Sequence, residues 1–152
     1  MNHAAASEYD TDLLIWIHQQ VELLRAKKFD QLDIENLIDE VESIGIQFKI
    51  EFSDHLEMVM KYLLKCEYQA AHPPQKWKSL LWDHRCQMSD ILEDMPSLEN
   101  SFDEYCTEAY SYAVEQVTLE AKVARSKLPS ANPYSKQQLF DLDYLPESRR
   151  LQ

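Results

Sequence analysis

The residues best suited to metal chemistry are three histidines, His18, His55 and His84, which lie on or beside the apolar stripes of expected helices. Helical bundles can gather histidines from separate helices around one metal ion. If neighbouring helices run antiparallel, His18 lies about 20 Å and His84 about 7 Å from the level of His55. Because metal–nitrogen bonds measure about 2 Å, we expect no metal site and no cofactor. His55 and His84 remain the candidate ligands if this register is wrong.

A second set of polar residues lies beside the apolar stripe of the helix expected at 34–68. Paired carboxylates can perform acid–base catalysis when burial separates their pKa values. The antiparallel register also places Arg25 level with position 35, where it can form ion pairs with Glu35 or Asp39. We therefore expect a polar clasp between the first two helices rather than a catalytic site. The clasp residues are Arg25, Asp33, Glu35, Asn36, Asp39, Glu40 and Ser43.

Several common catalytic motifs are absent. The chain has one glycine, Gly45, which excludes a glycine-rich phosphate loop and a GxSxG nucleophile elbow. Its three cysteines have no zinc-binding spacing and are expected to be reduced and buried. A serine–histidine–acid triad is left open, since no local signature would reveal one.

The same scarcity of glycine predicts an all-α fold, because hairpins and tight turns need glycine at positive φ. Apolar periodicity predicts a single domain over 1–152, an up-down bundle of four main helices. The second helix would be about 54 Å long if straight, longer than its neighbours can cover. We expect a kink at Gly45, a second copy of the chain on the uncovered part, or both. The expected ranges are helices at 10–27, 34–68, 75–95 and 98–127, flexible residues at 1–8 and a packed, short helical tail at 129–152.

The net charge of −12 argues against non-specific nucleic-acid binding and against anionic membranes. The sequence has no apolar run of about 20 residues and no signal peptide at its start, so we expect a cytoplasmic protein. More than half of the 15 basic residues are expected near the turn at 71–74, and the acids near the other end. Such a dipole could steer a charged partner. This basic end comprises Lys61, Lys65, Lys76, Lys78, Arg85, Lys122, Arg125 and Lys127.

The run from Phe29 to Gly45, which contains Asp-Glu-Val-Glu-Ser-Ile-Gly, resembles the bacterial family catalogued as domain of unknown function twenty-nine. Tyr9-Asp10-Thr11-Asp12, Trp16 and the closing Asp143-Tyr144-Leu145-Pro146-Glu147 are similar to the same family. The resemblance implies a small all-helical bacterial protein. It implies no reaction and no catalytic residues.

Together these observations favour a non-enzymatic module that binds another protein or itself, as a homo-oligomer, through apolar helix faces and charged ends. Two alternatives stay open. One is a small metal-dependent or acid–base enzyme that uses His55 and His84. The other is a nucleic-acid-associated regulatory protein that binds through its basic end.

Overall fold

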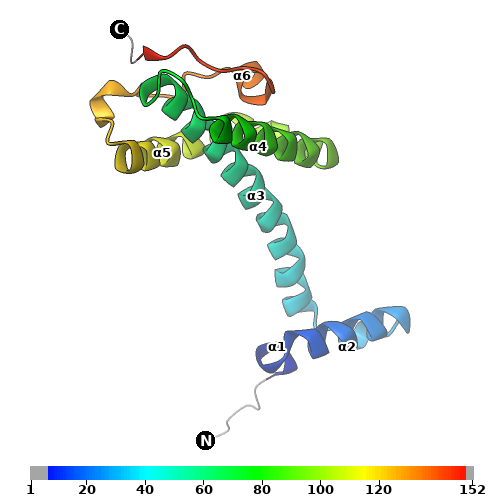
Figure 1. Cartoon of the computed structure of the whole chain (residues 1–152). Coiled ribbons are helices and arrows are strands. Elements are labelled where there is room, and N and C mark those ends of the chain that lie inside the picture. Colours follow the sequence, from blue (N-terminus) through cyan, green and yellow to red (C-terminus); the bar gives the residue numbers. More distant parts are fainter. Residues whose placement is uncertain (1–6, 150–152) are drawn as a thin grey trace, which may run out of the picture. The chain divides into compact units, whose positions relative to one another are not determined.

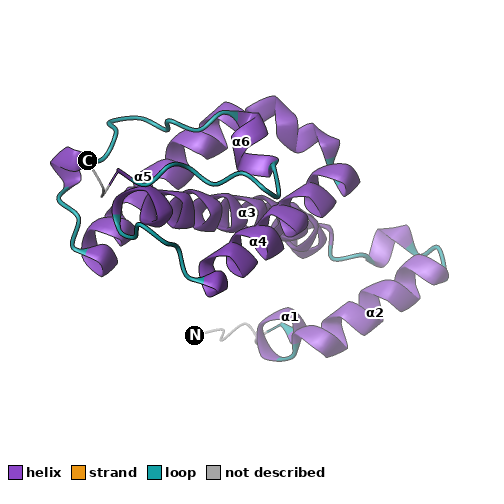
Figure 2. Ribbon diagram, turned by 45° about the horizontal axis from the view of Figure 1, so that its top comes forward, coloured by secondary structure: helices purple, strands orange, loops and turns teal. Residues whose placement is uncertain are grey.

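The computed structural model describes residues 7–149, and every regular element in that range is helical (Figures 1 and 2). The all-α prediction is confirmed. The prediction for residues 1–6 lies outside the described residues. The elements are α1 (Glu8–Thr11), α2 (Leu13–Arg25), η1 (Phe29–Gln31), α3 (Ile34–Tyr68), α4 (Gln75–Asp94), η2 (Pro96–Ser101), α5 (Phe102–Ala121), η3 (Arg125–Lys127) and α6 (Lys136–Phe140).

Capping side chains explain where several helices begin. The Asp12 carboxylate accepts a hydrogen bond from the Ile15 amide at the start of α2. Asp33 does the same for the Asn36 amide at the start of α3, as expected for an aspartate at this position. Ser135 and Gln138 form a reciprocal capping box on α6. These local signals are why α3 begins where the sequence predicts.

Two predicted helices have different boundaries in the structure. The helix expected at 10–27 is divided, because Asp12 has extended backbone angles between α1 and α2. The helix expected at 98–127 begins with the 3₁₀ turn η2 and ends at Ala121 rather than at Lys127. Lys122 takes the left-handed conformation there, with φ of 53°, which ends an α-helix.

Helix α3 is assigned as one α-helix through Gly45. Nothing lies within 4 Å of the position that a Cβ atom would occupy on this glycine. A glycine inside a helix costs about 1 kcal/mol relative to alanine. Neither backbone geometry nor packing within the described residues accounts for that cost.

The chain divides into two compact units at residues 46 and 47, so the single-domain interpretation of 1–152 stays a prediction. We call residues 7–46 the N-terminal unit and 47–149 the C-terminal unit. The C-terminal unit holds a continuous apolar core, built from the later part of α3 with α4, α5 and the tail. Its tail, including α6, lies across the longer helices of that unit (Figure 1), which confirms the short helix predicted in 129–152.

No helix among the described residues is long and apolar enough to cross a membrane.

Candidate functional site

Asp33 is the centre of a polar cluster in the N-terminal unit. Its carboxylate accepts hydrogen bonds from the Trp16 indole at 3.0 Å and the Asn36 amide side chain at 2.8 Å. Its own backbone N–H donates to the side-chain oxygen of Gln20 at 2.9 Å. The bond from Asn36, followed by that from Trp16, lowers the pKa of Asp33. These bonds fasten α2 to the start of α3, and because they stabilise the charged carboxylate they make it a weaker base.

A second bond in the same unit joins α1 to α3. The Tyr9 hydroxyl donates to the Glu40 carboxylate at 2.9 Å, and the Tyr9 ring meets the Trp16 ring edge-on. The bond to Glu40 is the main cause that raises the pKa of the Tyr9 hydroxyl.

The structure therefore builds a clasp with partners other than those predicted from the sequence. Arg25 pairs with Glu22 on its own helix at 2.8 Å. Within residues 7–149, Glu35, Asp39 and Ser43 form no ion pair or side-chain hydrogen bond. Trp16 and Gln20 were missed as clasp residues, although their spacing of four places them on one helix face.

His55 and His84 lie much closer than the predicted register allows. Their Nδ1 atoms are 2.8 Å apart and their ring centroids 5.1 Å apart. The prediction of an offset of about 7 Å is wrong because it assumes parallel helix axes, whereas α4 crosses the later part of α3 at an angle (Figure 1). Near such a crossing, a level measured along parallel axes no longer predicts the distance between two side chains.

The histidine pair is suited to sharing a proton. One neutral imidazole donates through Nδ1 and the other accepts. Burial, and then the neighbouring His55, lower the pKa of His84. Glu51 approaches His55 Nε2 only to 4.0 Å. The described residues include no cluster of three or more His, Cys, Asp or Glu side chains placed to hold a metal ion.

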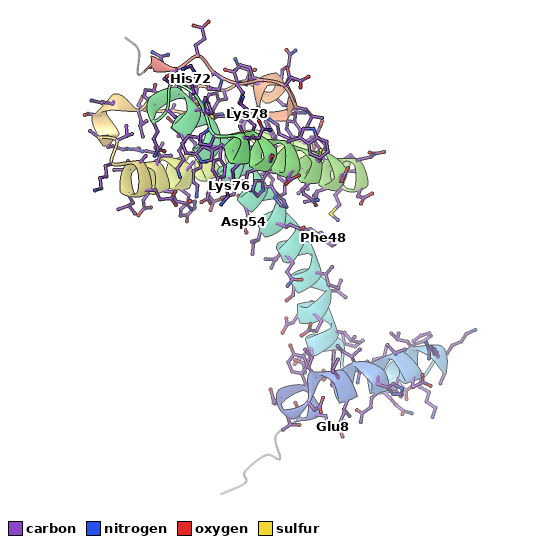
Figure 3. The ribbon with its side chains drawn as sticks, in the orientation of Figure 1. Glu8, Phe48, Asp54, His72, Lys76 and Lys78 are labelled. Carbon is purple, nitrogen blue, oxygen red and sulfur yellow. The ribbon has the colours of Figure 1, made fainter. Side chains whose placement is uncertain are left out.

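Three residues of the predicted basic end serve internal contacts. Lys61 and Lys65 both form ion pairs with Glu120 on α5, at 3.1 and 2.5 Å. Arg85 is 1% exposed and donates to the backbone carbonyls of Leu139, Tyr144 and Gln138 at 2.8 to 3.0 Å. The other five basic residues are exposed, including Lys76 and Lys78 on α4 (Figure 3). They are Lys76, Lys78, Lys122, Arg125 and Lys127.

The buried charges of the C-terminal unit fasten its tail. Glu67, on α3, accepts hydrogen bonds from the Tyr134 hydroxyl at 3.0 Å and from Arg149 Nε at 2.5 Å. Burial and the Glu67 carboxylate raise the pKa of Tyr134. A cavity of about 360 Å³ lies between α4 and the tail, with Arg85 in its wall. Tail carbonyls accept hydrogen bonds from all three guanidinium nitrogens of Arg85 in this wall.

The N-terminal unit exposes most of its large apolar side chains. Among residues 7–149, it contains eleven of the seventeen exposed large hydrophobic residues, but only Trp16 of the twenty-two buried ones. Monomeric proteins rarely expose so many large apolar side chains close together. The eleven residues are Leu13, Leu14, Ile15, Ile17, Leu24, Phe29, Ile34, Ile38, Val41, Ile44 and Ile46; we call them the apolar surface.

Comparison with known proteins gives one match. A family model described as "Domain of unknown function DUF29" matches residues 8–145. No curated protein and no solved structure matches the chain.

Proposed function

Because the chain belongs to the DUF29 family, whose description names no activity, we propose a function from its physical features: a protein–protein interaction module that binds through the apolar surface of its N-terminal unit. The observation that carries this proposal is the concentration of exposed Leu, Ile, Val and Phe side chains in residues 13–46.

The free energy available from covering these apolar side chains is of the size that binding requires. Full burial of one Leu, Ile or Val side chain contributes about 1.5 to 3 kcal/mol. Most of the eleven side chains are about half exposed, from 39% at Ile17 to 78% at Leu14. Each would therefore gain only about half of that value on being covered, so most of the eleven must be covered to offset the free-energy cost of association, which is about 4 to 15 kcal/mol.

The polar groups of the same unit support a binding role over a catalytic one. Asp33 and Glu40 hold α1 and α2 against α3 through Trp16 and Tyr9. Their bonds fix the helices whose apolar side chains stay uncovered. A scaffold with fixed backbone and exposed apolar side chains reduces the entropy lost on binding.

Recovery of the tagged chain from its native host tests the proposal. We expect a companion in equal amount, either another protein or an untagged copy of this chain. Replacing Ile38 and Val41 together by Gln should abolish that recovery. A matched control replaces Tyr112 and Leu119, which are exposed apolar residues of the C-terminal unit, and should leave recovery unchanged. Equal recovery with the Ile38/Val41 variant, or no companion for the wild-type chain, would contradict the proposed interface.

A further inference from the structure

One face of α3 combines exposure with a regular apolar spacing. Ile34, Ile38, Val41 and Phe48 follow one another on this face, with Gly45 between the last two. Steps of three and four residues keep them on one side of a helix. The four side chains are 36% to 66% exposed. Their spacing is that of the contact positions in a pair of packed helices.

Gly45, the single glycine of the chain, sits in the middle of this face. Its surroundings are open, and its φ is not in the left-handed region. Glycine on a helix face allows a second helix backbone to approach closely, because it has no side chain. Gly45 is exposed, and a second helix could approach the backbone there without meeting a side chain.

One acidic and one basic residue, Glu42 and Lys49, lie beside this face. Lys49 is the only basic residue between Lys28 and Lys61, and it forms no ion pair or hydrogen bond within residues 7–149. Glu42 precedes it by seven residues, about two helical turns, so both side chains border the same edge of the face. Gly45 lies between the two.

We propose that the partner of this face is α3 of a second copy, packed antiparallel so that the two helices cross at Gly45. This inference rests on the proposed function and names the partner. A two-fold axis at the crossing places Val41 of each copy near Phe48 of the other. It also brings Lys49 of each copy to Glu42 of the other, which forms two equivalent ion pairs.

The pattern favours a second copy over a different protein. A two-fold contact requires apolar residues on both sides of its centre, and Gly45 has Ile38 and Val41 before it and Phe48 after it. A basic helix of another protein would pair with Glu42, but it would leave Lys49 beside like charge. Self-pairing satisfies both charges at once.

Charge exchange tests the antiparallel register by sedimentation equilibrium of the full chain. We expect the wild-type chain to dimerise with a dissociation constant of about 100 µM or less. Glu42→Lys and Lys49→Glu should each raise the dissociation constant about tenfold, because each replaces two attractions with two repulsions. The double variant should recover the wild-type constant. Asp39→Lys makes the same charge change as Glu42→Lys away from the face, and Gln47→Glu adds one negative charge there. Both should leave the constant unchanged.

Gly45 variants test the crossing point. Gly45→Gln should keep the helix content, or raise it, and raise the dissociation constant by about 100-fold or more, because a long side chain separates the helices. Ser43→Gln, on the other side of α3, should not change it. Circular dichroism confirms that each variant is folded.

Three results would overturn the inference. A wild-type chain that stays monomeric excludes the second copy, while recovery of another protein would still support the proposed function. A dimer that the charge exchange fails to restore excludes the antiparallel register. A dimer that tolerates Gly45→Gln excludes the crossing point.

Discussion

The two units differ in how they use the same kind of apolar side chain. In the C-terminal unit, Leu56, Leu63 and Met88 are fully buried in one core. In the N-terminal unit, Ile38, Val41 and Ile44 are more than half exposed, and polar bonds around Asp33 hold the helices together. Helical periodicity is equally clear in both. An apolar stripe therefore does not by itself show whether the chain's own core buries it.

The largest expected difference between the units concerns stability. Leu63→Ala, in the core, should lower the free energy of unfolding by about 3 kcal/mol, because it removes packed methyl groups and leaves a cavity. Ile38→Ala, on the exposed face, should change it by less than about 1 kcal/mol in the monomer. Urea unfolding followed by circular dichroism measures both. A cost at Ile38 as large as that at Leu63 would remove the distinction between a self-sufficient core and an uncovered surface.

The next largest effect concerns the buried and exposed basic residues. Arg85→Met should release the tail and cost about 2 to 3 kcal/mol, because it leaves one buried and two partly buried carbonyls without their donor. Hydrogen exchange of residues 138–144 should rise with it. Lys78→Met, on the exposed side of the same helix, is the matched control and should change neither quantity. Unchanged exchange in Arg85→Met would show that the tail is fastened by other contacts.

A smaller effect should appear as a pH dependence of the C-terminal unit. Burial and His55 lower the pKa of His84 in the folded chain, so the unfolded chain takes up the proton first as the pH falls. The stability from the neutral pair is complete above the unfolded value of about 6.5. It is lost as the pH falls from there through the lowered folded pKa. His84→Asn should flatten this decline in thermal unfolding between pH 8 and 5, whereas the exposed His72→Asn should not. A wild-type profile that stays flat would contradict this role.

The smallest effects concern the clasp of the N-terminal unit. Asp33→Ala should increase hydrogen exchange at the start of α3 and along α2, because it removes the acceptor of Trp16 and Asn36. At low pH the wild-type chain should show the same loosening, since protonation through the lowered pKa of Asp33 weakens those bonds. Arg25→Ala should leave exchange unchanged, because Arg25 pairs with the exposed Glu22. Faster hydrogen exchange in Arg25→Ala, but not in Asp33→Ala, would instead support the ion pairs of Arg25 with Glu35 or Asp39 that the sequence predicted.

Much of the fold could be predicted because its signals are local. Asp33 as a helix cap and Pro73-Pro74 after α3 predicted the boundaries of the longest helix. The early end of α5 was missed, because the residue with left-handed backbone that ends the helix is Lys122 rather than a glycine, so the sequence carries no signal for it. The candidate sites were predicted less well. The pairing of His55 with His84 depends on the crossing of α3 and α4, and an antiparallel register could not supply it.

The sequence by itself determined the all-α class, the extent of α3 and the capping of its first turn, because these follow from glycine scarcity, apolar periodicity and hydrogen bonds over a few residues. Only the tertiary structure decided which charges become internal. Arg85, Lys61 and Lys65 resemble the other basic residues in the sequence, yet helix packing buries these three and leaves Lys76 and Lys78 exposed. Tertiary packing also decided that one apolar stripe became a core and the other an open face. The physical reason is that burial depends on which elements meet, a property of the whole chain rather than of any segment.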